Sequence, residues 1–189
     1  MIDERSTLED VCFGVASVLD RCSIEAVLTG GSAATMYAPH AYTSLDADFV
    51  LANFPDRESL RLALAELAFV PSATLGMFEH PHSKFTIDFP KGPLAVGGDY
   101  IHEIAILERA NMRLRILTPT DCVRDRLAHF YYWGDYTALK AAVGVAQSQR
   151  GSVDLSKLRV WTERESGAGS DHRPKFAEFL DRIDRTGDR

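Results

Sequence analysis

The sequence contains few cysteines, and none of them has a metal-binding spacing. Its three cysteines, Cys12, Cys22 and Cys122, are an odd and scattered set, which does not indicate a disulfide framework. No Cys-x-x-Cys pair or Cys/His cluster has the spacing of a zinc site. Cys12 and Cys22 fall on the apolar side of a helical repeat, so we expect both to lie in the core.

Long apolar runs are absent as well. No stretch approaches the roughly 20 residues that a membrane-spanning helix requires. The first ten residues, MIDERSTLED, are acidic and lack the apolar core of a signal peptide. We therefore expect a cytoplasmic protein without a membrane partner. There is no internal repeat, and 189 residues suffice for one domain with a sizeable core.

Positive charge is scarce in the first part of the chain. Residues 1–108 carry six Lys/Arg and sixteen Asp/Glu, a balance of -10, whereas residues 109–189 carry fifteen and eleven, a balance of +4. The split indicates either an acidic half that holds metal beside a basic half that meets phosphate, or ordinary solvated helix faces. Because there is no long basic tract, non-specific affinity for nucleic acid should be weak.

Hydrophobic periodicity predicts a core that mixes strands and helices, followed by a helical tail. A capping box at Ser6–Glu9 opens the first helix, and Thr120 caps the first helix of the tail. We place the core at 1–117 and the C-terminal helical segment, packed on it, at 118–189. The expected strands are 25–31, 44–52, 82–89 and 112–118, and further helices are expected at 32–38, after Asp56, and at 135–149, 156–166 and 175–183.

The motif Gly30-Gly31-Ser32 precedes a short helix. Paired glycines allow a sharp turn and a close approach to a ligand. A serine at a helix start leaves backbone N–H groups and a hydroxyl pointing outward, where the helix dipole favours an anion. The motif therefore indicates either a phosphate-binding turn or a simple helix cap, and the cap is the commoner of the two.

Three aspartates interrupt apolar strands. Asp46 and Asp48 are two residues apart on one strand, so their carboxylates leave the same face. Asp88 lies between Ile87 and Phe89 on a later strand. Such oxygen ligands suit Mg²⁺ or Mn²⁺, which also bind phosphate oxygens. The alternative is an exposed strand face, although solvated aspartates are unusual on central strands.

The combination of Gly31 and Ser32, then Asp46 and Asp48, then Asp88 resembles the nucleotidyltransferase superfamily, the fold of DNA polymerase β. The run GGSAATMYAPHAYTSLDADF is similar to a small bacterial branch that includes toxins of abortive-infection and toxin–antitoxin systems. The later LRILTPTDCVRDRLAHFYYW looks like the helical entry of small members. The resemblance covers roughly residues 24–145.

The resemblance implies an α+β fold, with a mixed sheet flanked by helices and followed by a C-terminal helical tail. It also implies an enzyme that moves an NMP from ATP or another NTP to an acceptor hydroxyl and releases pyrophosphate. Ser32 and the N–H groups near Gly31 would hold the β- and γ-phosphates. Asp46 and Asp48 would bind two Mg²⁺ ions, and Asp88 would bind the second ion and help to take the hydroxyl proton. A cognate toxin or antitoxin protein is a further possible partner.

Several other polar residues have two interpretations each. Ser44 shares the face of Asp46, and it either contacts phosphate or is an ordinary polar strand residue. Lys84 shares the face of Asp88, and it either contacts the triphosphate or makes no contact with it. His80 and His82 are expected at the surface. In one interpretation, three residues of the tail helices line the cleft: Arg124, Arg126 and Lys140. In the other interpretation, Arg126 pairs with Asp125 or Asp121.

Trp133 and Tyr136 are expected to pack at a helix end, although an aromatic residue there can stack on a base. The acceptor is an RNA 3′ end, a protein hydroxyl or a small molecule such as an aminoglycoside, and the basic tail places RNA slightly first. The first alternative to a transferase is a catalytically silent nucleotide-binding or interaction module. The other is a metal hydrolase that combines the three aspartates with His80 and His82.

Overall fold

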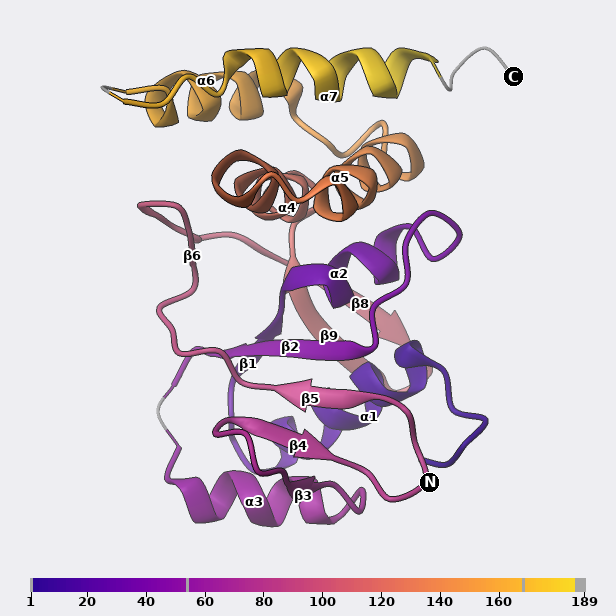
Figure 1. Cartoon of the computed structure of the whole chain (residues 1–189). Coiled ribbons are helices and arrows are strands. Elements are labelled where there is room, and N and C mark those ends of the chain that lie inside the picture. Colours follow the sequence, from indigo (N-terminus) through magenta and orange to yellow (C-terminus); the bar gives the residue numbers. More distant parts are fainter. Residues whose placement is uncertain (1, 54, 168, 186–189) are drawn as a thin grey trace.

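The computed structural model describes residues 2–53, 55–167 and 169–185, and Figure 1 shows the arrangement of their elements. The α-helices are α1 (Leu8–Arg21), α2 (Gly30–Tyr37), α3 (Arg57–Ala65), α4 (Pro119–Trp133), α5 (Tyr136–Ser148), α6 (Leu155–Glu165) and α7 (Arg173–Arg185). The strands are β1 (Ala26–Leu28), β2 (Asp46–Leu51), β3 (Val70–Pro71), β4 (Met77–Glu79), β5 (Thr86–Asp88), β6 (Ala95–Val96), β7 (Asp99–Tyr100), β8 (Ile104–Arg109) and β9 (Met112–Leu117).

Most of the strands form one mixed sheet, in the order β3-β4-β5-β2-β1-β9-β8. β2 runs antiparallel to β1 and parallel to β5, and β1 runs parallel to β9. β6 and β7 form a separate two-stranded unit, the β6–β7 hairpin. The predicted α+β class with a mixed sheet is confirmed.

The alternation of β2 and β5 sets the two faces of the sheet centre. Ala47 and Phe49 of β2 and Ile87 of β5 are completely buried, which leaves the aspartates of both strands on the opposite face. Leu45 has the same parity as Ala47 and Phe49, but it is 53% exposed. It precedes the first residue of β2, so the pleat of the strand does not direct it into the core.

The helices after the sheet stack in two layers. In Figure 1, α4 and α5 lie over α2, and α6 and α7 lie beyond them. One continuous cluster of buried side chains extends from Val11 of α1 to Phe179 of α7. A side chain at Gly144 would overlap Ala41, because α5 packs directly against the turn after α2. None of the helices in the described residues is both long and apolar enough to cross a membrane.

Two helix caps lie elsewhere than the sequence predicted. The capping box of α1 joins Thr7 and Asp10, one residue after the predicted pair. The cap of α4 is Thr118, whose hydroxyl accepts from the Asp121 N–H, and Thr120 lies inside the helix. In both places a neighbouring threonine supplies the oxygen that the helix start requires.

Cys22 is also misplaced by periodicity. Cys12 is buried, but Cys22 is the exposed C-cap residue of α1, where the helical repeat has ended.

Five strands of the structure were not predicted from the sequence patterns. β3, β4, β6 and β7 contain only two or three residues, too few to display a period of two. β8 is an edge strand on which Ile104 and Ile106 remain partly exposed.

Candidate active site

The predicted carboxylates come together on neighbouring strands. β2 and β5 pair in parallel register, with Asp48 opposite Asp88 and Asp46 opposite Thr86. Residues that are opposite each other in a parallel pair project from the same face of the sheet. The Thr86 hydroxyl donates to Asp46 Oδ1 over 2.5 Å. Asp46 and Asp48 therefore share one face, as the sequence predicted, and the strand pairing places Asp88 on the same face.

Gly30 makes room for the Asp48 carboxylate. Its φ is +63°, and a Cβ atom built on it would overlap Asp48 Oδ2. Thr29 connects β1 to α2, and its N–H donates to the Asp48 carbonyl oxygen over 2.8 Å. A glycine is required here for two reasons, the left-handed backbone and the adjacent carboxylate.

The Ser32 hydroxyl is completely buried and points inward. It donates to the Thr29 carbonyl oxygen over 2.8 Å and accepts from the Asp48 N–H over 3.1 Å. The expectation that this hydroxyl points outward from the helix start is wrong, because α2 already begins at Gly30 and Ser32 lies inside its first turn. Ser32 instead fixes the position of Asp48 on β2.

Gly31 and Ser44 also belong to the supporting structure. A Cβ on Gly31 would lie 3.0 Å from the Tyr42 hydroxyl and 3.2 Å from Ser44 Oγ. Ser44 is buried, and its N–H donates to the Thr35 hydroxyl over 2.9 Å. These contacts hold the turn that leads from α2 into β2.

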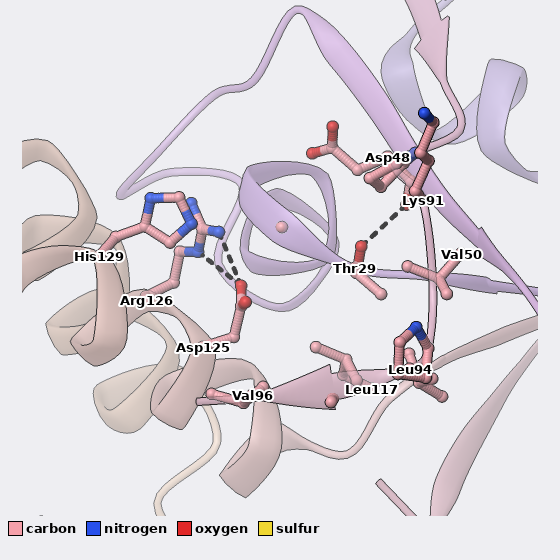
Figure 2. A pocket seen from close by; sticks show the side chains of 14 residues that line it. Thr29, Asp48, Val50, Lys91, Leu94, Val96, Leu117, Asp125, Arg126 and His129 are labelled. Atoms are coloured by element: carbon pink, nitrogen blue, oxygen red, sulfur yellow. Dashed lines mark hydrogen bonds and ion pairs between the residues drawn. The ribbon is translucent and has the colours of Figure 1, made fainter. Parts of the chain in front are cut away.

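A pocket of about 370 Å³ lies between the start of α2, β2, the segment 90–96 and α4. Figure 2 shows Asp125, Arg126 and His129 of α4 across this pocket from Thr29 and Asp48. We call it the Asp48 pocket. Of the predicted site residues, Gly30, Asp48 and Arg126 line it. The described lining does not include Gly31, Ser32, Ser44, Asp46, Lys84 or Asp88.

The lysine of the pocket is Lys91, which sequence reasoning missed. Lys84 is exposed, and its ammonium lies 5.1 Å from the centre of the Phe85 ring, outside the described lining. Lys91 follows β5 directly and lines the pocket with Asp48. The sequence offered only its position, three residues after Asp88 in the segment that follows β5, where no periodic pattern marks a side chain.

Arg126 supplies a second cation to the pocket and is itself buried. Its guanidinium donates to Asp125 Oδ2 over 2.7 and 2.9 Å, as one of the sequence interpretations proposed. Burial alone would lower the pKa of Arg126, but the Asp125 carboxylate raises it, so the charge is retained. A buried, charged arginine facing an acidic strand favours an anionic ligand between them.

The Asp48 carboxyl has a strongly altered acidity. Burial is the main cause that raises its pKa to about 7, and the neighbouring Asp88 and Asp46 raise it further, while Arg126 opposes the rise. A carboxylate in this setting is only partly compensated, by Arg126. A divalent cation would supply the remaining positive charge, so the donor set fits Mg²⁺ or Mn²⁺.

The carboxylates do not form a closed metal cage. Among the described residues, no three or more His, Cys, Asp or Glu side chains are grouped so as to hold a metal ion. Mg²⁺ commonly takes few protein ligands and completes its shell with water and substrate phosphates. The hydrolase alternative needs protein histidines in the shell. His80 is instead buried against Phe69, with ring centres 5.0 Å apart.

Trp133 and Tyr136 follow His129 along the chain, and both lie outside the described lining of the Asp48 pocket. The Trp133 ring lies 5.0 Å from the His129 ring and the residue is 72% exposed, so the expectation that Trp133 packs inside is wrong. Tyr136 is 58% exposed, although one edge of its ring contacts Phe130. Burial and the Arg126 charge lower the pKa of His129, which favours the neutral imidazole.

On another side of α4, charged residues form what we call the ion-pair cluster, which consists of Asp99, Asp121, Arg124, Lys157 and Arg164. Arg124 lies 3.1 Å from Asp121 and 3.4 Å from Asp99, and Arg164 lies 2.5 Å from Asp99. Arg124 lines an opening of about 510 Å³ in this cluster and is absent from the described lining of the Asp48 pocket. The cluster connects the β6–β7 hairpin to α4 and α6. Lys140 is exposed on α5 and lies outside both linings.

Comparison with known proteins identifies the fold. No family model and no curated protein sequence matches the chain. An antigenic nucleotidyltransferase-like protein from Paracoccidioides brasiliensis has a similar structure, with a TM-score of 0.58 and 13% identity over 95% of this chain and 94% of that one. The structure of ANT(2″)-Ia in complex with adenylyl-2″-tobramycin gives a TM-score of 0.51 and 16% identity over 94% and 99% of the two chains. A solution structure of ANT(2″)-Ia, an antibiotic-resistance factor, gives a TM-score of 0.51 and 14% identity over 89% and 92%. The chain therefore has an α+β nucleotidyltransferase-like fold.

Proposed function

We propose that the protein is a metal-dependent nucleotidyltransferase that moves an NMP from an NTP to an acceptor hydroxyl. The observation that carries this proposal is the register of Asp48 with Asp88 beside a pocket lined by Lys91 and Arg126. Asp48 on one wall, with Lys91 and the Arg126–Asp125 pair elsewhere in the lining, suits a metal-bound triphosphate. Similarity of fold to nucleotidyltransferases supports the same activity.

The proposed transfer is a displacement at the α-phosphorus. The acceptor oxygen forms a bond to that phosphorus, and the bond to the oxygen that bridges the α- and β-phosphates breaks. Pyrophosphate leaves with the bonding electrons, and the hydroxyl proton passes to Asp88. Lys91 and Arg126 bind the triphosphate, and the Ser32 and Gly30 contacts keep Asp48 in place.

Asp46, Asp48 and Asp88 would hold Mg²⁺ or Mn²⁺. When bound, such ions offset the negative charge of the phosphates and of the leaving pyrophosphate. The Asp46 carboxylate is oriented by the Thr86 hydroxyl, which leaves its second oxygen for a metal. The protein residues thus provide part of a coordination shell that the triphosphate completes.

The charge split of the chain first favoured RNA as the acceptor, with a protein side chain second. Two of the arginines on which that expectation rested are buried, since Arg124 is 4% exposed and Arg126 is 8% exposed. Both are held in ion pairs. The tail helices therefore offer less free positive charge to an RNA backbone than the sequence indicated. A cognate toxin or antitoxin partner stays a prediction.

Calorimetry tests the nucleotide and metal parts of the proposal. NTP should bind much more tightly with Mg²⁺ than with EDTA, because the carboxylates repel an uncompensated triphosphate. Asp88→Asn should keep NTP affinity within a few-fold yet lower transfer by orders of magnitude. Equal affinity with Mg²⁺ and EDTA would rule out the metal-dependent site. Normal nucleotide binding without any transfer by the wild type would favour the catalytically silent alternative.

A further inference from the structure

A second hollow, of about 420 Å³, lies between the start of α3, the connection from β3 to β4 and the end of β5. We call it the α3 groove. In Figure 1, α3, β3 and β4 lie at the opposite end of the molecule from α6 and α7. Its apolar lining includes Leu60, Phe78 and Phe89, and Leu75, which is 69% exposed, also lines it. A hollow of this volume with an apolar lining is typical of small-molecule sites.

The α3 groove is separate from the proposed site of transfer. Phe78 of β4 pairs with Ile87 of β5, and the Phe89 ring stacks on the Phe49 ring with the centres 6.3 Å apart. Ile87 and Phe49 are completely buried on the face of the sheet opposite the three aspartates. The described lining of the groove contains none of those aspartates. A molecule in the groove would therefore be a ligand other than the NTP and the acceptor.

The α3 groove has an excess of positive charge. Three cations line it, Arg57, Arg61 and Lys91, against one carboxylate, Glu58. Arg61 is paired with Glu58 over 2.5 Å. Arg57 and Lys91 are exposed and have no ion pair within the part of the chain that the structure describes. Two unpaired cations beside apolar side chains favour a ligand that has an apolar body and an anionic group.

Lys91 belongs to both hollows. It follows β5 and lines the α3 groove and the Asp48 pocket alike, although the two lie on opposite faces of the sheet. Its single ammonium group cannot pair fully with an anion in each hollow at the same time. An anion bound in the groove would therefore take positive charge away from a triphosphate in the Asp48 pocket. By linkage, the triphosphate would weaken the groove ligand by the same factor.

We propose that the α3 groove is a second ligand site, which takes a small molecule with an apolar ring and one anionic group, and that this ligand opposes NTP binding through Lys91. The ring would lie on Phe78 and Phe89, whose own rings meet edge to face with their centres 5.8 Å apart. The anionic group would lie by Arg57 and Lys91. A polycation would meet these two charges with Glu58 already paired, so it is excluded. The binding site goes beyond the proposed function, whereas the opposition to NTP rests on it.

A pair of fluorescent probes tests the groove without requiring catalysis. The probes are 2-naphthoate and its neutral amide, which match in ring and size and differ in charge. The naphthoate should bind at least about fivefold more tightly than the amide, the combined effect of two exposed ion pairs. This preference should shrink in Arg57→Gln and vanish in Arg57→Gln/Lys91→Met. Leu75→Ser should weaken both probes, and Arg113→Gln, on an exposed residue of β9, should change neither.

Titration of the naphthoate with and without a saturating NTP and Mg²⁺ tests the role of Lys91. The NTP should weaken the naphthoate about two- to fivefold, the range for one exposed ion pair, and the naphthoate should weaken the NTP equally. In Lys91→Met the two ligands should bind independently. Arg126→Met is the matched control, because Arg126 lines only the Asp48 pocket and its loss should leave the mutual weakening in place.

The possible results separate this inference from the proposed function. Failure of both probes to bind, equal binding of the two, or a preference that survives the double variant would overturn the groove as an anion-selective site. Independent binding of naphthoate and NTP to the wild type would overturn the role of Lys91. If the naphthoate binds as expected but no NTP binds with Mg²⁺, the proposed function and the opposition fail, while the groove stands as a binding site.

Discussion

Helix α4 places two buried arginines in two different surroundings. Arg126 lines the Asp48 pocket, with Asp125 as its ion-pair partner. Arg124 belongs to the ion-pair cluster, where it contacts Asp121 and Asp99. Residues two apart on a helix point in directions about 200° apart, so one helix serves both regions. An arginine thus lines the proposed ligand site on one side of α4, and another arginine belongs to the ion-pair cluster on the other side.

The two regions differ in how their charges are balanced. In the ion-pair cluster, Asp99 and Asp121 each contact more than one cation, and the cluster holds the β6–β7 hairpin against α4 and α6. In the Asp48 pocket, Asp48 has no ion pair among the described residues, and burial raises its pKa to about 7. Matched charges indicate a structural role, whereas unmatched charges around a cavity indicate a ligand.

The largest expected effect is on stability, at Arg124. Arg124→Met leaves Asp121, which is 2% exposed, without its closest cation and should lower the free energy of unfolding by about 3–5 kcal/mol. Urea denaturation measures this change. The double variant Asp121→Asn/Arg124→Met should recover part of the loss. NTP affinity of the folded variant should be unchanged, and a large change in it would contradict a purely structural role.

Arg126 is also buried and ion-paired, so its removal should lower stability, but unlike removal of Arg124 it should also weaken nucleotide binding. Arg126→Met removes a cation from the Asp48 pocket and should weaken NTP binding by about 1.5–3 kcal/mol, the range for hydrogen bonds to charged groups. Calorimetry with Mg²⁺ present measures the affinity. Arg164→Met, in the ion-pair cluster, is the matched control and should bind NTP normally. Unaltered binding in Arg126→Met would remove the distinction between the two arginines.

Gly30 tests whether the position of Asp48 matters more than its presence. Gly30→Ala introduces a Cβ that overlaps Asp48 Oδ2 at a φ of +63° and should lower stability by about 1–2 kcal/mol. Transfer should fall much further than stability, because the carboxylate is displaced. Gly98→Ala, where a Cβ meets open space, is the control. Thermal unfolding measures the loss of stability, and initial rates of transfer on the same samples measure the loss of activity.

The smallest effect is expected at an exposed ion pair, which provides a reference for the buried cluster. The Thr7 N–H, the Thr7 hydroxyl and Arg109 lower the pKa of Asp10. A carboxyl with a lowered pKa in the folded state stabilises the protein above its ordinary pKa, and that contribution is lost as the pH falls through the folded value. Asp10→Asn should therefore cost at most about 1 kcal/mol at pH 7 and almost nothing at pH 2–3. A loss that stays constant with pH would contradict the titration of Asp10.

Sequence reasoning identified the carboxylates because a strand makes their placement predictable. Asp46, Asp48 and Asp88 interrupt apolar alternation, and the period of two puts Asp46 and Asp48 on one face of their strand. The pairing of β2 with β5 was not readable, because strand order depends on contacts far apart in sequence. The central fold was likewise predictable from β1, α2 and β2, whose patterns are local.

The misplaced residues have a common cause. Ser32 was expected to face outward, but the helix begins two residues earlier and its hydroxyl bonds to the Asp48 N–H. Helix boundaries are the least certain part of any pattern, and a shift of one or two residues changes the direction of a side chain. Lys91 lies in the segment between β5 and β6, outside any strand, where the sequence carries little periodic signal.

The most direct test of the nucleotidyl-transfer site is incorporation of label from α-labelled NTPs into a cell lysate by the wild type and by Asp48→Asn. The wild type should transfer label from at least one NTP with Mg²⁺, and it should lose this transfer with EDTA. Asp48→Asn keeps the shape of the side chain but removes its charge, and transfer should fall to background. Equal labelling by the two proteins, or no labelling with any NTP, would contradict the assignment of Asp48 to nucleotidyl transfer.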